Sequence, residues 1–276
     1  MSPIITLTTD FGLNDAYVAA MKGVILGINP EVTLVDICHT IEPQNIAQAA
    51  FVLDTAYQSF PRGTVHLAVV DPGVGSHRRA VILRTASADF VAPDNGALSY
   101  VIREASPEGT EGKQPAGLRP ELEAFAISEP RFWRTPVSPT FHGRDIFAPV
   151  AAYLSLGHPP ADFGERLNSL VMLPLTNPEQ KRDGSVLGHI LHIDSFGNLI
   201  TDITAHDLPT KSEMLSIKVG EQTIQGLVRT YAEGEGLLAL IASSGYLEVA
   251  FKEGGAAALL GAGVGSEVRV RRKDIG

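Results

Sequence analysis

The sequence predicts an α/β N-terminal domain with a mainly parallel sheet, followed by an all-β, barrel-like C-terminal domain. Strand and helix patterns alternate along the first half of the chain, as in a parallel sheet with right-handed crossovers. After about residue 175 the pattern changes to short strands separated by turns, with little helix. The domains are expected over residues 1–165 and 175–276, and a chain of 276 residues suits two domains of ordinary size.

The composition is that of a globular protein, with 44% hydrophobic and 19% charged residues. No apolar run reaches the roughly 18 to 20 residues that a bilayer-spanning helix needs, so no membrane span is expected. A formal net charge of −9 without a basic stripe argues against a nucleic-acid partner. The first residues have the pattern of a strand rather than of a signal peptide, which predicts a cytoplasmic protein.

The first quarter of the chain predicts the order strand, helix, strand, helix, strand. The first helix follows Asn14 or Asp15, either of which can cap its amino end, and it stops at Asn29-Pro30. Apolar residues recur at helical spacing in both helices. The third strand ends in a continuous apolar run, which is typical of a strand buried on both faces. The expected strands are 4–9, 33–37 and 67–70, and the expected helices are about 17–28 and 45–60.

Three carboxylates stand near the carboxyl ends of these strands. Asp10 follows the first strand, Asp15 lies shortly after it, and Asp71 follows the third. Successive parallel strands share one carboxyl edge, and ligands of open α/β sheets bind at that edge. The sequence therefore predicts that the three carboxylates gather at one rim of the first domain.

The turn after Asp71 contains Gly73 and Gly75, which permit a sharp bend over the end of the strand. Arg78 can then return to face Asp71. A carboxylate beside a permanently charged guanidinium, at the sheet edge where ligands bind, is typical of a binding or catalytic site. An ordinary turn with a surface ion pair explains the same residues equally well.

The rest of the first domain contains further strands, a short helix through 100–104 and one later helix. The later helix follows Thr140–Asp145 and has apolar residues at helical spacing, which places His142 just before its start. A histidine in that place is, by itself, more often a capping or structural residue than a catalyst. The expected strands are 80–85, 89–92 and 122–127, and a surface loop is expected at 106–120.

The second domain has two loops rich in turn-forming residues, Asp194–Asn198 and Ser243–Tyr246. Each is compatible with a tight hairpin turn. The many short strands around them are typical of a barrel or a sandwich. These strands are expected at 186–193, 199–203, 214–219, 222–228, 237–241, 246–251 and 267–271.

Several familiar motifs are incomplete. Asp10-Phe11-Gly12 matches the metal-binding tripeptide of protein kinases, and His142–Asp145 loosely resembles their catalytic loop. The glycine-rich loop and the strand lysine that should precede both are missing. No Walker A loop follows the first strand, and no HExxH spacing occurs. Asp10, Asp71 and His142 are too sparse to predict a metal centre. A metal-dependent hydrolase is therefore a weak alternative.

Five motifs taken together resemble the S-adenosylmethionine (SAM) hydroxide adenosyltransferase family. They are TTDFG near the start, VVDPGVGSHRR around Asp71, TFHGRD around His142, DSFGN at Asp194 and SSGYLE at Ser243. The family is similar to the fluorinase and chlorinase. The resemblance implies the same two-domain fold and cleavage of SAM by water to adenosine and methionine. It also implies that there is no cofactor, and that a homotrimer has its sites between subunits.

The resemblance implies a role for each motif. Asp71, Arg78 and His142 would activate water, since the halogenases have tyrosine in place of Asp71 and His142. Asp10 would bind the ribose hydroxyls, and the remaining residues would bind the methionine and adenine parts. These are Asp15 and Asp194 for the ammonium group, Ser243 and Ser244 for the carboxylate, Phe196 and Asn198 for adenine, with Tyr246, Glu248 and Phe251 completing the substrate-binding set.

Two other functions fit the same resemblance. Gly143 stands where the fluorinase has a halide-binding serine, which argues against fluoride as the nucleophile but leaves a chlorinase-like halogenase open. A non-catalytic sensor that binds adenosine or SAM is the alternative from a different class, because fold alone does not establish catalysis.

Overall fold

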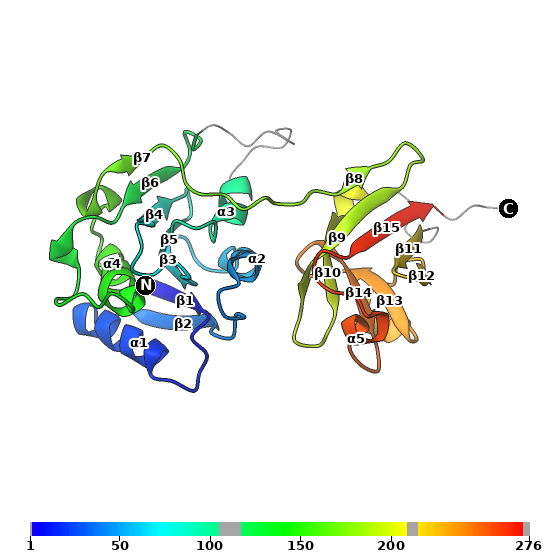
Figure 1. The fold of residues 1–276 in the computed structure, drawn as a ribbon, viewed down its shortest axis with the longest axis horizontal. Helices are drawn as coiled ribbons and strands as arrows, with labels where there is room; N and C mark the ends of the chain where they lie inside the picture. Colours follow the sequence, from blue (N-terminus) through cyan, green and yellow to red (C-terminus); the bar gives the residue numbers. More distant parts are fainter. Residues whose placement is uncertain (1, 105–116, 209–214, 273–276) are drawn as a thin grey trace. The chain divides into compact units, whose positions relative to one another are not determined.

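The structure is a computed structural model that describes residues 2–104, 117–208 and 215–272. The chain divides into two compact units, residues 1–174 and 175–276 (Figure 1). No helix among the described residues is long and apolar enough to cross a membrane. The loop expected at 106–120 falls largely outside the described residues.

The first unit contains a seven-stranded sheet in the order β2-β1-β3-β5-β4-β6-β7. Strands β2, β1, β3 and β5 are parallel to one another, and β4, β6 and β7 extend the sheet in antiparallel fashion. The strands are β1 (Ile4–Thr9), β2 (Thr33–Cys38), β3 (Thr64–Val69), β4 (Ala80–Arg84), β5 (Ala88–Pro93), β6 (Glu123–Ala126) and β7 (Arg166–Leu167).

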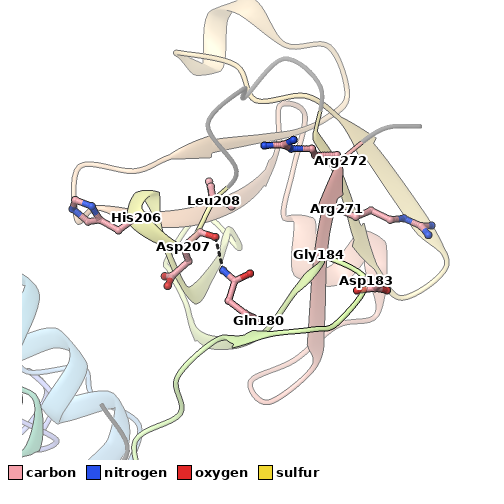
Figure 2. Close-up of a pocket in the computed structure, with 8 residues that line it drawn as sticks. All are labelled: Gln180, Asp183, Gly184, His206, Asp207, Leu208, Arg271 and Arg272. Atoms are coloured by element: carbon pink, nitrogen blue, oxygen red, sulfur yellow. Dashed lines mark hydrogen bonds between the residues drawn. The ribbon is translucent and has the colours of Figure 1, made fainter. Parts of the chain in front are cut away.

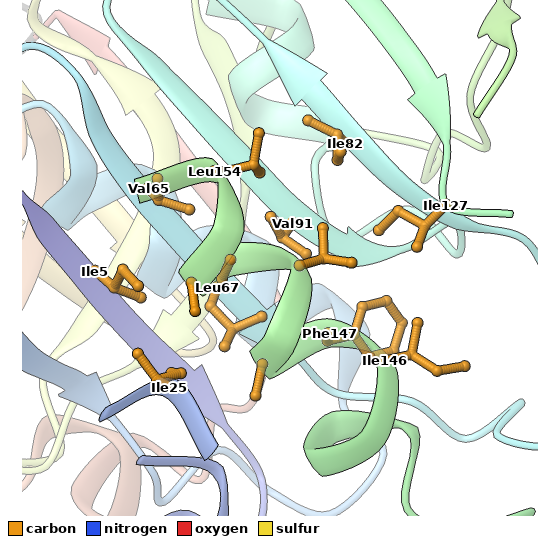
Figure 3. Packing of buried hydrophobic residues seen from close by; sticks show 14 of the residues in the cluster. Ile5, Ile25, Val65, Leu67, Ile82, Val91, Ile127, Ile146, Phe147 and Leu154 are labelled. Atoms are coloured by element: carbon orange, nitrogen blue, oxygen red, sulfur yellow. The ribbon is translucent and has the colours of Figure 1, made fainter. Parts of the chain in front are cut away.

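Helices cover both faces of this sheet. α1 (Tyr17–Ile28) and α4 (Ala148–Ser155) pack on one face, while α2 (Ile46–Tyr57) and α3 (Ser99–Glu104) pack on the other. Side chains alternate along β3, so the strand contacts helices on both faces. Val65 and Leu67 pack in the cluster that contains α4 (Figure 3), whereas Ala68 packs in the cluster that contains α2 and α3. Each large side chain buried in this way stabilises the fold by about 1.5–3 kcal/mol.

The starts of the helices differ in how they are capped. Asn45 caps α2, since its side-chain oxygen accepts a hydrogen bond of 2.9 Å from the Gln48 N–H. The cap expected at Asn14 or Asp15 is wrong. α1 begins after Ala16 without a side-chain cap, and its first turn closes through the Ala20 N–H and the Ala16 carbonyl. The Asp15 carboxylate is therefore not used as a helix cap.

His66 of the first unit lies in the core. The side chain of His66, on β3, is almost fully buried and stacks on Phe90 at 5.0 Å between ring centroids. Its Nδ1 lies 2.8 Å from the Thr6 hydroxyl. Burial lowers the pKa of His66 to about 4, so that the ring is neutral near pH 7. His66 is thus a structural histidine.

The second unit is an antiparallel sheet in the order β12-β11-β15-β9-β10-β14-β13, with β8 paired to β9. The two ends of the sheet approach each other, because the Val228 N–H, just after β12, donates to the Ala239 carbonyl of β13 at 2.9 Å. The predicted fold class is confirmed. The elements are β8 (Glu179–Gln180), β9 (Val186–Ile193), β10 (Leu199–Thr204), β11 (Leu215–Val219), β12 (Gln222–Gln225), β13 (Leu237–Ile241), β14 (Tyr246–Phe251), α5 (Ala256–Leu260) and β15 (Glu267–Arg272).

Candidate active site

Asp71 lies at the carboxyl end of β3, in the centre of the parallel part of the sheet. The chain turns immediately after it, and the Val74 N–H donates to the Asp71 carbonyl at 3.2 Å. Gly75 has φ +77°, and a Cβ there would lie only 2.5 Å from the Pro139 carbonyl oxygen. Glycine is therefore needed for the turn to approach the segment that leads to His142.

Arg78 binds Asp71 through two of its nitrogens. Nε lies 2.9 and 3.0 Å from the two carboxylate oxygens, and a terminal nitrogen also donates to Oδ2. The two side chains are only 12% and 6% exposed. The guanidinium lies 5.2 Å from the centre of the buried Phe147 ring, which excludes water from one side of it. This partly buried pair is thus held much more firmly than a surface ion pair.

His142 contacts the same guanidinium. The terminal nitrogen of Arg78 lies 2.8 Å from His142 Nδ1. Because a guanidinium can only donate, Nδ1 must accept, and the proton of the neutral ring is then on Nε2. Burial and then the charge of Arg78 lower the pKa of His142, against the opposite effect of the Asp71 and Asp145 carboxylates. A neutral imidazole with an Nε2–H donor results.

The segment that carries His142 is fixed by Asp145. This carboxylate is fully buried and accepts hydrogen bonds from the Ser138 N–H at 2.8 Å and from Arg144 at 2.7 and 2.8 Å. His142 directly precedes a π-helical turn, Gly143–Phe147, which runs into α4. The sequence places His142 correctly before a helix, but the wider turn cannot be recognised from residue spacing.

Asp10 lies at the same sheet edge as Asp71. The parallel register pairs Thr9 with Val69, so Asp10 and Asp71 follow neighbouring strands. The Asp10 carboxylate accepts a hydrogen bond of 2.8 Å from the Gln44 N–H. Gln44 has φ +67°, a conformation that non-glycine residues rarely adopt. Asp15 is exposed in the segment between β1 and α1.

The loop between β9 and β10 is built around Asp194. Its Oδ1 accepts from the backbone N–H groups of Phe196 and Asn198, both at 2.9 Å, and its Oδ2 accepts from the Asn198 side chain at 3.0 Å. Asn198 is buried, whereas the ring of Phe196 is 78% exposed. Hydrogen bonds within the loop therefore fix its shape, and the loop exposes the Phe196 side chain.

The remaining predicted residues lie on or beside β14. Ser243 and Ser244 are exposed in the turn before it, while Tyr246 and Glu248 are buried within it. Glu248 accepts a hydrogen bond of 2.7 Å from the Tyr231 hydroxyl, and burial raises the pKa of Glu248. Tyr231 was not predicted, because it lies in a short turn of the chain without a recognisable motif.

The two loops of the second unit lie at opposite ends of the β10–β14 pair. Leu199, next to the Asp194 loop, pairs with Val249, whereas Thr204 pairs with Tyr246, next to the serine turn. Phe251 ends β14 on the side of the Asp194 loop and is partly buried. The structure thus separates the residues predicted for adenine and ammonium from those predicted for the carboxylate.

Two cavities lie on the separate units. One of about 420 Å³ is lined by residues around the His142 segment, namely Phe11, Tyr17, Ser138, Thr140, Phe141 and Arg144. The other, of about 710 Å³, lies on the barrel unit between β8, β15 and the turn after β10 (Figure 2). Neither cavity is lined by a predicted site residue. Among the described residues, no group of three or more His, Cys, Asp and Glu side chains could hold a metal ion.

The fold and the polar site define a class of protein: a two-domain protein with an α/β sheet that carries charged groups at one edge, followed by a barrel-like domain. Residues 5–164 match the SAM hydroxide adenosyltransferase N-terminal domain, and residues 188–269 match the C-terminal domain of the same name. The chain belongs to the SAM hydroxide adenosyltransferase family.

Known relatives agree with this assignment. The chain is 37% identical to the (R)-S-adenosyl-L-methionine hydrolase of Salinispora tropica over 98% of both chains. It is 31% identical to the fluorinase of Nocardia brasiliensis over 90% of both chains. A solved structure of an uncharacterized conserved protein from Thermotoga maritima is 34% identical, with a TM-score of 0.86, over 97% of this chain and all of the other.

Proposed function

We propose that this protein hydrolyses SAM to adenosine and methionine, and that Asp71, Arg78 and His142 activate the water. The observation that carries this proposal is the position of the Arg78 guanidinium, which donates to both the Asp71 carboxylate and His142 Nδ1. The name of the S. tropica relative, an (R)-S-adenosyl-L-methionine hydrolase, supports the same reaction.

The reaction needs an activated nucleophile more than an acid. The water oxygen bonds to the ribose 5′ carbon while the carbon–sulfur bond breaks, and the electron pair of that bond leaves with sulfur, which becomes the neutral thioether of methionine. A sulfonium leaves without protonation, so the site must orient water in line and take up its proton. No Lewis acid or cofactor is required for either task.

We assign the proton to Asp71 rather than to His142. Nδ1 of His142 accepts from Arg78 and Nε2 already carries a proton, so neither nitrogen of the neutral ring is free to act as a base. A carboxylate has about four acceptor positions, and contacts with one guanidinium leave room for a water. In this mechanism His142 Nε2–H donates to the water oxygen or to the substrate and so orients the attack.

The substrate contacts are proposals of the same kind. Asp10 binds the ribose hydroxyls, Asp15 the ammonium, and Ser243 and Ser244 the carboxylate. Because the ammonium and the carboxylate of methionine are attached to one carbon, we assign Asp194, at the other end of the β10–β14 pair from the serine turn, to the adenine side instead. Phe196 is supported as an adenine contact by its exposed ring. Asn198 and Glu248 are bonded to Asp194 and Tyr231, respectively, which supports a role in shaping the barrel side of the pocket. The cytoplasmic location remains a prediction.

A halogenase is the second candidate, because the fluorinase of N. brasiliensis is also a relative. The packing around Gly143 argues against fluoride as the nucleophile. A Cβ at this position would lie 3.3 Å from both Met21 Sδ and the Phe11 ring, so a serine hydroxyl would need these side chains to move. The carboxylate and imidazole at positions 71 and 142 also suit a nucleophile that must lose a proton, which halide does not.

The test is product analysis by mass spectrometry after incubation with SAM. We expect adenosine and methionine from the purified protein, at a rate that neither added chloride nor exhaustive chelation changes. The (R) sulfonium epimer is expected to react faster than the (S) epimer, as the relatives' name suggests. Chlorinated nucleoside would support the halogenase, and tight binding of SAM without product would support the sensor.

We also propose that the active form is a homotrimer in which each site combines the first unit of one subunit with the barrel of a neighbour. The support is that the proposed groups are divided between two separately folded units. Two inactive variants, Asp71→Ala and Asn198→Ala, should then regain activity when they are co-assembled, because some interfaces combine two intact halves.

The matched control for this experiment pairs Asp71→Ala with Arg78→Ala. Both changes damage the same unit, so mixed assemblies should remain inactive. Turnover can be measured after the variants are unfolded together and refolded as a mixture. If light scattering shows a monomer at the assay concentration and that monomer is fully active, the shared site is contradicted.

A further inference from the structure

Both ends of the turn that carries Asp71 and Arg78 are bonded to one short segment, Asp94-Asn95. The Asn95 side-chain N–H donates to the Val70 carbonyl at 2.9 Å, immediately before Asp71. The Asp94 carboxylate accepts from Arg79 Nε at 2.8 Å, immediately after Arg78. The Asp94 N–H also donates to the Arg79 carbonyl at 2.9 Å. The turn is therefore clamped at Val70 and Arg79, the two residues that flank it.

Asp94 is itself rigidly held. Its side chain is only 3% exposed, and its second oxygen accepts a hydrogen bond of 2.7 Å from the Val171 N–H. Arg79 also donates to the Ser169 carbonyl at 3.0 Å. A buried carboxylate with partners on two sides cannot shift without losing charge-assisted hydrogen bonds. The clamp thus joins the turn to the end of β5 and to the segment that follows β7.

A similar pair at the other end of the same hairpin has no link to the turn. Arg84 binds Asp89 with two hydrogen bonds of 2.7 Å where β4 pairs with β5. Arg79 and Asp94 flank the opposite end, next to the Ala80–Pro93 pair. The hairpin therefore carries one arginine–aspartate pair at the candidate site and a comparable pair away from it.

We propose that Asp94 and Asn95 are positioning residues, which fix the two ends of the 71–78 turn and so hold Asp71 and Arg78 in contact with His142. The proposal rests on the proposed function for its effect on rate. The turn contains two glycines and has no regular structure, so its shape depends on how its ends are anchored. Misplacement of a reacting group by about 1 Å can lower the rate by about 100-fold.

Two near-isosteric variants test the clamp. Asp94→Asn keeps the shape but removes the charge that Arg79 binds, while Asn95→Asp keeps the acceptor for the Ala97 N–H and removes the donor to Val70. We expect kcat to fall by about 10- to 100-fold with KM changed less than about threefold. The control Asp89→Asn should leave kcat within about twofold, since its pair lies away from the turn.

A second measurement does not depend on turnover. The charged groups acting on His142 are Arg78, Asp71 and Asp145, and loss of contact with Arg78 should raise the pKa of His142. NMR titration of the His142 ring should show this rise in Asp94→Asn and in Asn95→Asp, but not in Asp89→Asn. The proposal is overturned if both variants match Asp89→Asn in this titration. Wild-type protein that fails to cleave SAM would overturn the proposed function and leave this comparison valid.

Discussion

Asp71→Asn should lower kcat by about 10²–10⁴-fold, the usual contribution of a positioned proton acceptor. The amide retains the size of the side chain and one oxygen that can accept from Arg78, but it cannot take up the proton of the attacking water. KM should change little, because we assign Asp71 to the water and not to the substrate. Single-turnover release of adenosine measures the chemical step directly.

The control is Asp89→Asn, which also removes a carboxylate from an arginine pair of the same sheet. Thermal unfolding of both variants separates loss of fold from loss of chemistry. A double change of Asp71 and His142 should lower the rate by less than the product of the single effects, since both act on one water. Turnover close to wild type in Asp71→Asn would exclude Asp71 as the proton acceptor.

Arg78→Met should lower kcat by about 10²–10³-fold, because it removes the donor that Asp71 and His142 share. It should also change the pH dependence. In the wild type, burial and the positive charge of Arg78 both lower the pKa of His142. Without that charge the imidazole becomes easier to protonate, and the nearby Asp71 carboxylate, then unpaired, favours the imidazolium further.

The sign of the pH effect follows from this. As pH falls, His142 of the variant protonates at a higher pH than in the wild type, and its imidazolium then binds the carboxylate that should accept the proton. The acid limb of the profile of kcat/KM against pH should therefore move to higher pH. Arg84→Met is the matched control and should leave the profile in place. An unmoved acid limb in Arg78→Met would show that His142 is not coupled to Arg78.

Much of the site's location could be predicted from local sequence. The apolar run before Asp71 and the glycines after it indicate a buried strand followed by a sharp turn. Such a turn lets Arg78 face Asp71, and the two side chains are in contact. The position of Asp10 beside Asp71 follows from the parallel order of β1 and β3. These features depend on short-range pattern and on the rule that parallel strands share an edge.

Other features depend on contacts between distant residues and had no local signal. The bond between Arg78 and His142 joins positions far apart in sequence, and it decides which nitrogen of the ring carries the proton. The expected cap of α1 was wrong because Asn14 and Asp15 are good cap residues that the helix start does not use. The burial of Glu248 against Tyr231 likewise results from barrel packing, which residue type alone does not indicate.

The bond between Val171 and the buried Asp94 also has a consequence for chimeras that exchange barrels between relatives. We propose that the α/β domain extends to Pro174, since β7 pairs with β6 and the Leu173 N–H donates to Ser99 at 2.8 Å. A crossover at residue 165 would replace these partners, and each buried polar group left unpaired costs about 1–3 kcal/mol. A crossover after Pro174 would transfer the barrel and leave the support of the 71–78 turn intact.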